Sequence, residues 1–219
     1  MGVILSPAID APNADQPVAE CSLCPRLVRC REKLTFSSPV VPHGPSEASV
    51  LIVCHAPDHT RSSARGPAFL DREAETLLYK TLVEFDLARR HVNDNGEDCI
   101  IPTGSRVISA VRCPAPAGLP QPSEITTCNQ FLRSELQTMP NLRIVVTLGV
   151  LAHNATLAAC GIPLSRVNFQ HGQITSMPDG LKIANSHPLS RHTFDTGQTT
   201  PAHFRSLMAA VRQELGTEA

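Results

Sequence analysis

The chain has 219 residues, of which 42% are hydrophobic and 18% charged, and its formal net charge is −1. This composition is that of a soluble globular protein with one domain of ordinary size, large enough to bury a core. No run of about 18 or more apolar residues occurs, so a membrane span is excluded and we expect no membrane partner. The near-neutral charge also lacks the overall basic character of many nucleic-acid binders, although residues 26–33 form a local basic stretch.

Residues 1–20 predict a mobile leader ahead of a single domain over residues 21–219. The leader is rich in Pro, Ala and Asp. No basic residue precedes its short apolar run at residues 3–5, so it lacks the pattern of a signal peptide. We therefore expect a cytoplasmic protein.

The hydrophobic pattern predicts strands that alternate with helices along the chain. Strands are expected over residues 49–53, 106–111, 143–148 and 182–185. Helices are expected over residues 73–87, 123–138, 149–159 and 200–215. Strands separated by helices of this length indicate one α/β domain with three layers, α/β/α, around a central, mostly parallel, four-stranded sheet. Ligands of such sheets bind outside the carboxyl ends of the strands, and the unusual loops of this chain follow those ends.

Eight cysteines are many for a chain without an export signal, and we expect ligands or buried apolar thiols rather than disulfides. Cys21 and Cys24 form a C-x2-C pair. Cys113 and Cys128 lie fifteen residues apart, one after a strand and one inside the next helix. Four such thiolates can bind either zinc or an iron–sulfur cubane. The other four are expected to be buried apolar thiols, with Cys30 the nearest rival as a ligand: Cys30, Cys54, Cys99 and Cys160.

Several short motifs follow one another between about Cys21 and Leu215. They are CSLCPRL at 21–27, ISAVRCP at 108–114, SEITTC at 123–128, VTLGVLAH at 146–153, FQHG at 169–172 and HPLSR at 187–191. Each motif alone is weak, but in this order the chain resembles the uracil-DNA glycosylase superfamily, in particular its iron–sulfur types, families 4 and 5. The resemblance implies a [4Fe–4S] cluster on four cysteines: Cys21, Cys24, Cys113 and Cys128.

The same resemblance implies a monofunctional glycosylase that hydrolyses the N-glycosidic bond of uracil, or of another deaminated base, in DNA and starts base excision repair. The partner is then DNA that contains uracil or another damaged base. We expect a monomer, associated with the nucleoid if the source is bacterial.

Four positions depart from the family pattern. Cys54 replaces a glycine, and His55 stands where family 4 has a glutamate that activates water. Ser109 occupies the strand position of an asparagine that reads uracil. Leu189 is an extra residue in the His-Pro loop. These departures concern the range of substrates more than the fold.

The chemistry of base removal assigns roles to several residues. The base must be extruded from the duplex into a pocket, where Phe69 matches the family's stacking platform. His187, at a strand end and next to Pro188, suits the donor to the carbonyl oxygen of the departing base. Further contacts to the base are expected from four residues: Ser109, His171, Ala56 and Pro57.

The attacking water needs an acceptor, and the oxocarbenium-like sugar benefits from a nearby negative charge. Asp71 is the first candidate and Asp58 the second. His55 is the alternative, and it would have to work as a neutral imidazole. Leu189 is expected to wedge into the space left by the flipped base. The DNA strand is expected to meet four polar residues: Ser190, Arg191, His192 and Arg65.

Two other interpretations fit the same sequence. Because the family 4 glutamate is missing, the chain could bind uracil-containing or abasic DNA with weak turnover. The four thiols could instead hold zinc in a nucleic-acid-binding or scaffold module.

Overall fold

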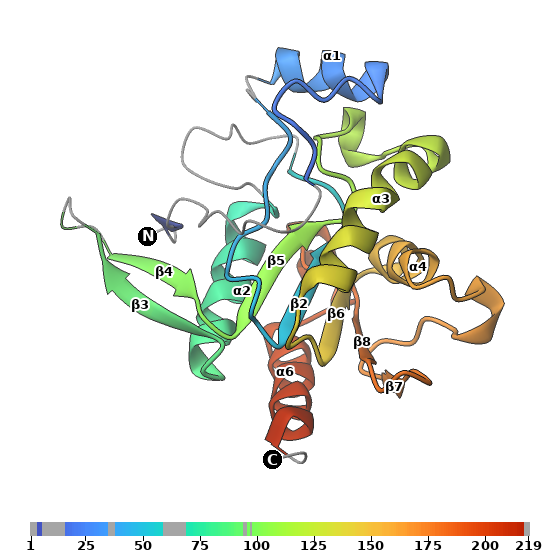
Figure 1. The fold of residues 1–219 in the computed structure, drawn as a ribbon. Helices are drawn as coiled ribbons and strands as arrows, with labels where there is room; N and C mark the ends of the chain where they lie inside the picture. Colours follow the sequence, from blue (N-terminus) through green and yellow to red (C-terminus); the bar gives the residue numbers. More distant parts are fainter. Residues whose placement is uncertain are drawn as a thin grey trace.

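A five-stranded sheet lies at the centre of the computed structural model, which describes residues 4–5, 16–34, 38–58, 69–93, 96 and 98–216. The strand order is β5-β2-β6-β8-β7 (Figure 1). The first four strands are parallel: β5 (Ser105–Ser109), β2 (Val50–Cys54), β6 (Ile144–Leu148) and β8 (Lys182–Ser186). The predicted parallel sheet is confirmed, but the predicted count of four strands is wrong. The fifth strand, β7 (Ile174–Ser176), has three residues, too few to show a hydrophobic pattern, and pairs antiparallel with β8.

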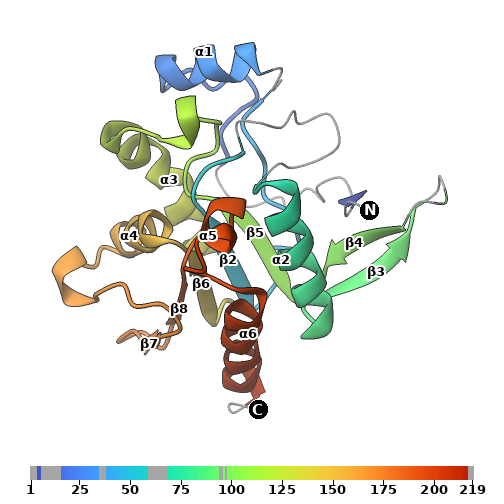
Figure 2. The same cartoon turned by 180° about the vertical axis from the view of Figure 1, so that it is seen from behind.

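Helices cover both faces of this sheet, as expected for three layers. Figure 1 shows α3 (Pro122–Thr138) and α4 (Val150–Ala159) in front of the sheet. Figure 2 shows α2 (Arg72–Glu84) and α6 (Pro201–Gly216) in front of the opposite face. Successive side chains of a strand point to opposite faces, and β2 therefore contributes to two hydrophobic clusters. Val50 and Ile52 belong to the cluster with α2 and α6, and Leu51 to the cluster with α3 and α4.

Some elements have no counterpart in the predicted set. A second sheet has the order β1-β4-β3 and consists of β1 (Ile4–Leu5), β4 (Asp98–Pro102) and β3 (Ala88–Val92). Three short helices are η2 (Pro116–Gly118), η3 (Leu164–Arg166) and α5 (Arg191–Asp195). The predicted helix to residue 87 ends at Glu84, because Asp86 adopts a positive φ of 59° that is incompatible with a helix.

Helix α1 (Pro25–Lys33) lies at the end of the molecule next to α3 (Figure 1). Leu27 is buried, and the Arg26 guanidinium donates two hydrogen bonds to the Glu124 carboxylate, at 2.8 and 2.6 Å. Glu124 lies in the first turn of α3. Contacts between residues 98 positions apart, rather than the local sequence, therefore hold this helix.

The segment before residue 21 contacts the domain at two described places. Ile4–Leu5 pair with β4, and the Gln16 side chain donates to Glu135. The domain boundary at residue 21 stays a prediction. Among the helices that the structure describes, none has the length and apolar character needed to cross a membrane.

Candidate active site

His187 follows the end of β8 at the edge where all four parallel strands end. Its backbone N–H donates a 2.9 Å hydrogen bond to Nδ1 of His171. The two imidazole rings are stacked, with centroids 4.5 Å apart and planes 13° apart. Nδ1 of His171 must therefore be unprotonated, and burial, with His187 and His203 nearby, lowers the pKa of His171. The predicted donor His187 is thus held in place by His171, which was itself predicted to contact the base.

Gly149 fixes the loop that carries His187. Gly149 has a φ of +98°, and its N–H donates to the Ser186 carbonyl at 2.7 Å. A Cβ at this position would lie 2.8 Å from Cγ of Pro188, closer than real side chains approach. Only glycine combines this backbone conformation with this close approach, so the turn between β6 and α4 sets the position of the His-Pro loop.

A buried polar network lies beneath the histidine pair. Oδ1 of Asn185 accepts a hydrogen bond from Thr147 at 2.8 Å and lies 2.8 Å from Nδ1 of His153. The ring of Phe169 packs edge-on against His153 and also contacts His187, both at centroid distances of 5.7 Å. Strands β6 and β8 and helix α4 are therefore joined directly under His187.

The ends of β2 and β5 carry two buried polar groups, His55 and Ser109. The Val111 N–H donates to the His55 carbonyl at 3.2 Å, and Cys54 pairs with Ser109 in the sheet. Among the described residues, neither Nε2 of His55 nor Oγ of Ser109 has a hydrogen-bond partner. Burial lowers the pKa of His55, which keeps the imidazole neutral at neutral pH. Buried polar atoms without partners are groups that a bound polar molecule could satisfy.

The two predicted carboxylates differ in their surroundings. Oδ1 of Asp71 accepts from the Ala74 N–H as the N-cap of α2, and Oδ2 accepts from the Arg191 N–H, both at 2.9 Å. Asp71 therefore lies beside the His187 loop, as its predicted role requires, but both of its oxygens already hold backbone groups. Asp58 is half-buried on the loop after β2, where it follows Ala56 and the buried Pro57 in the sequence.

The predicted wedge residue lies in the core. Leu189 is 1% exposed and belongs to the cluster that includes Phe204 and Met208, so it could enter the duplex only after a movement of neighbouring residues, and its wedge role stays a prediction. Phe69 is also 1% exposed and belongs to the same cluster. A base could reach its ring only after a movement of neighbouring residues, and its stacking role stays a prediction.

Three predicted DNA contacts lie at the start of α5. The Ser190 hydroxyl accepts from the Thr193 N–H at 3.2 Å and so caps this helix. The Arg191 side chain is 80% exposed, with Asp195 3.7 Å away, and His192 is exposed. Arg65, the fourth predicted contact, lies outside the described residues.

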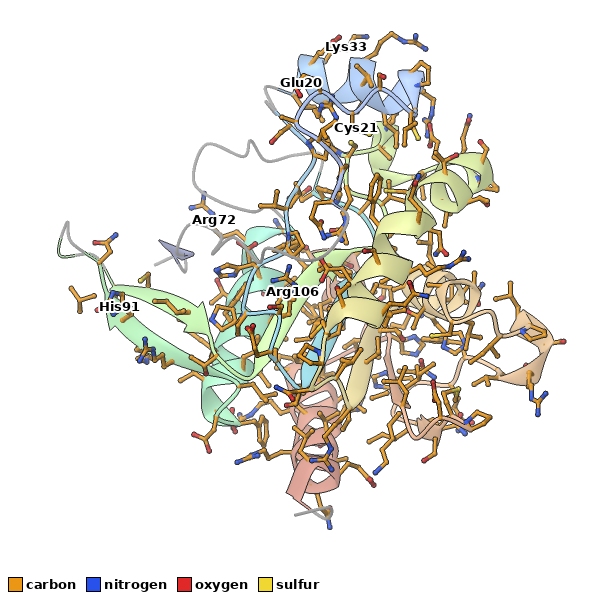
Figure 3. All side chains as sticks on the ribbon, in the orientation of Figure 1. Glu20, Cys21, Lys33, Arg72, His91 and Arg106 are labelled. Carbon is orange, nitrogen blue, oxygen red and sulfur yellow. The ribbon has the colours of Figure 1, made fainter. Side chains whose placement is uncertain are left out.

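The four cysteines chosen from their spacing line one cavity: Cys21, Cys24, Cys113 and Cys128. Cys21 lies on the segment just below α1, as Figure 3 shows. Cys30, the rival ligand, instead lines a separate hollow with Arg29 and Lys33. Across the described ranges, no three His, Cys, Asp or Glu side chains are grouped so that they could hold a single metal ion.

Two donors face the sulfurs of this cavity. Nη1 of the buried Arg31 donates to Sγ of Cys113 at 3.3 Å, and the Arg112 N–H donates to Sγ of Cys128 at 3.4 Å. Burial raises the pKa of Cys113 to about 11 and also raises the pKa values of Cys24 and Cys128. Without a metal, these thiols are protonated at neutral pH. No motif in the sequence pointed to Arg31, because its contact with Cys113 depends on how α1 packs.

Comparisons with known proteins show which family the sequence resembles. The model of the uracil DNA glycosylase superfamily matches residues 41–212. The chain is 30% identical over 212 residues to the type-5 uracil-DNA glycosylase of Thermus thermophilus, covering 92% of this chain and 96% of that protein. It is 26% identical to the type-5 uracil-DNA glycosylase of Mycobacterium bovis, over 92% of this chain and 80% of that protein. The protein of the same name from Pyrobaculum aerophilum is 28% identical, over 84% of each chain.

The contact between Gly149 and Pro188 predicts a loss of stability in Gly149→Ala. The positive φ costs about 1 kcal/mol and the contact with Pro188 about 1–3 kcal/mol more. Gly161→Ala is the matched control, because Gly161 also has a positive φ (+71°) but open space around its Cβ position. Urea unfolding of both variants measures the difference, and equal losses would show that Pro188 does not constrain Gly149.

The lowered pKa values of His171 and His55 predict that stability falls as the pH drops below about 6.5. Unfolded imidazoles take up protons near that pH and the folded ones only at lower pH, so protons favour unfolding by up to about 1.4 kcal/mol per pH unit for each group. His171→Asn removes the titrating group and should flatten the dependence. Urea unfolding between pH 7.5 and about 5.5 tests this, and an unchanged slope in the variant would contradict it.

Proposed function

The chain belongs to the uracil DNA glycosylase superfamily, and we propose that it is a monofunctional glycosylase that removes uracil from DNA and starts base excision repair. The observation that carries this proposal is the position of His187. A neighbouring histidine and a glycine contact hold it at the carboxyl edge of the parallel sheet, where His55 and Ser109 present buried polar atoms without described partners. Ligands of open α/β sheets bind at this edge.

The reaction needs a donor, an acceptor and a pocket for an extruded nucleotide. As the N-glycosidic bond breaks, the bond electrons leave with the base, and the sugar gains oxocarbenium character. The imidazole N–H of His187 stabilises the negative charge that develops on the carbonyl oxygen of the base. Water then forms the new bond to the sugar carbon, its proton passes to the side chain that orients it, and the released base anion takes up a proton to become neutral uracil. Ser109, His171, Ala56 and Pro57 remain the proposed contacts to the base, with Phe69 as the stacking ring.

Among the three candidates that could orient the water, His55 has the strongest support. Its Nε2 has no partner in the described part of the chain, and burial lowers its pKa, so a neutral imidazole can accept a hydrogen bond from water without opposing the positive sugar. Both oxygens of Asp71 hold backbone N–H groups, which suits a residue that positions the His187 loop. Asp58 stays the carboxylate alternative on the same loop as His55.

Cys21, Cys24, Cys113 and Cys128 would hold a [4Fe–4S] cluster with a structural role. Four thiols around one cavity are the donor set of such a cluster, in which each sulfur binds a different iron. Zinc, which four thiolates bind at about 2.3 Å, is the alternative for the same four cysteines. When bound, the cluster would tie the segment before α1 to the end of β5 and to α3, and it supplies no chemistry to base release.

The exposed start of α5 would meet the DNA backbone. Arg191 and His192 project from the loop that carries His187, so they can bind phosphates beside the extruded nucleotide. We assign the enzyme as a cytoplasmic monomer that acts on DNA, on the nucleoid of a bacterial cell, with residues 21–219 as its domain.

Base release should depend on His187 and on His55. With enzyme in excess over a uracil oligonucleotide, His187→Ala should lower the single-turnover rate about 100-fold or more, because it removes a transition-state donor. His55→Ala should lose on the order of 100-fold as well, and Asp58→Asn less. His91→Ala, on the exposed strand β3, is the control histidine variant.

Affinity for DNA, measured with the same oligonucleotide, should stay near that of the wild type in His187→Ala, since the lost interaction is made in the transition state. A wild-type rate in His187→Ala would remove His187 from the active site. A large loss in Asp58→Asn with little loss in His55→Ala would transfer the water-orienting role to Asp58.

A further inference from the structure

Two buried arginines share a single carboxylate in the layer between the sheet and α3. Arg106 donates to both oxygens of Glu135, at 2.8 and 3.3 Å, and also to the Gly44 carbonyl. Arg112 reaches the same carboxylate only as an ion pair of 3.6 Å. The side chains of all three ionic residues are no more than 3% exposed. This buried group of two cations and one anion therefore keeps one positive charge in excess.

The excess charge belongs to Arg112. Within the described chain, none of its three guanidinium nitrogens has a hydrogen-bond partner, although the side chain is 1% exposed. Arg106, by contrast, is fully engaged by Glu135 and Gly44. Arg112 therefore has only a carboxylate that Arg106 already engages, at 3.6 Å. A buried cation that is only partly compensated is unfavourable, so we expect a further anion beside it.

The four-thiol cavity is the place where that anion would form. Arg112 lines this cavity together with Cys21, Cys24, Cys113 and Cys128. Its backbone N–H donates to the sulfur of Cys128, so Arg112 is anchored beside one of the four sulfurs. Protonated thiols carry no charge and cannot compensate the guanidinium. Four thiolates outweigh the positive charge of a cluster core, so the filled site is anionic.

We propose that Arg112 is the counter-charge of the cluster, a cation that the shared Glu135 compensates only in part, so that the filled thiol site is electrically paired. This inference rests on the proposed [4Fe–4S] cluster. Arg112 then determines how firmly the cluster is held and stabilises its more negative, reduced state. Arg31 adds a hydrogen bond to the sulfur of Cys113.

An Arg112→Met variant separates this role from a purely structural one. The substitution leaves Arg106 and Glu135 as a balanced pair, so the apoprotein should be at least as stable as the wild-type apoprotein. The filled protein, in contrast, should lose iron faster. A structural role as a partner of Glu135 predicts the opposite order, with the loss of stability in the apoprotein and no effect on the cluster.

The experiment compares anaerobically purified wild type, Arg112→Met, Arg112→Lys and the control Arg133→Met, whose arginine is exposed on α3. Iron and zinc are counted, iron release to a chelator is timed, the reduction potential is measured by voltammetry, and the apoproteins are unfolded in urea. The wild type should contain about four irons per chain. Arg112→Met should release iron about 10- to 100-fold faster and have a more negative potential, while Arg112→Lys and Arg133→Met stay near the wild type.

Wild-type iron release and potential in Arg112→Met would overturn the inference and leave the cluster in place. One zinc, or no metal, in the wild type would overturn the proposed cluster and this inference with it, but not the glycosylase activity. If Arg112→Met does not fold, iron release, reduction potential and apoprotein stability are measured on Arg112→Gln instead, since that variant also removes the charge.

Discussion

The parallel pairing of β5, β2, β6 and β8 is the constraint on which the rest of the molecule depends. It brings four strand ends to one edge, and each end there delivers one part of the site. β5 ends at Ser109 and β2 leads into His55. β6 leads into Gly149, and β8 leads into His187. The proposed site is therefore assembled from segments that lie far apart in the sequence but adjacent in the sheet.

Holding polar groups at this edge requires support from outside the reacting residues. His187 is held through a backbone hydrogen bond to His171 and through Pro188 against Gly149. Asp71 joins the start of α2 to the same loop. The segment before α1 would be held in a similar way, because one cluster would join its two cysteines to Cys113 and Cys128. In both places a local group is positioned by contacts that the local sequence does not specify.

This division explains what the sequence could predict. The apolar strand residues 50–53 are a local signal, and the strand forms where it was expected. The four cysteines chosen from their spacing line one cavity, and their role as ligands stays a prediction. The three residues of β7 are too few for a periodic pattern, and α1 depends on the bond from Arg26 to Glu124. The loop motif suggested that Leu189 is an exposed wedge. Its burial depends on packing against residues that are distant in the sequence, which the motif does not show.

We propose that this edge of the sheet releases uracil rather than only binding it. The direct test incubates excess wild-type protein with an oligonucleotide that contains one uracil, and with a matched strand that contains thymine. Alkaline cleavage then reports abasic sites. The account predicts complete conversion of the uracil strand and none of the thymine strand. Tight binding of the uracil strand without any abasic product would contradict it.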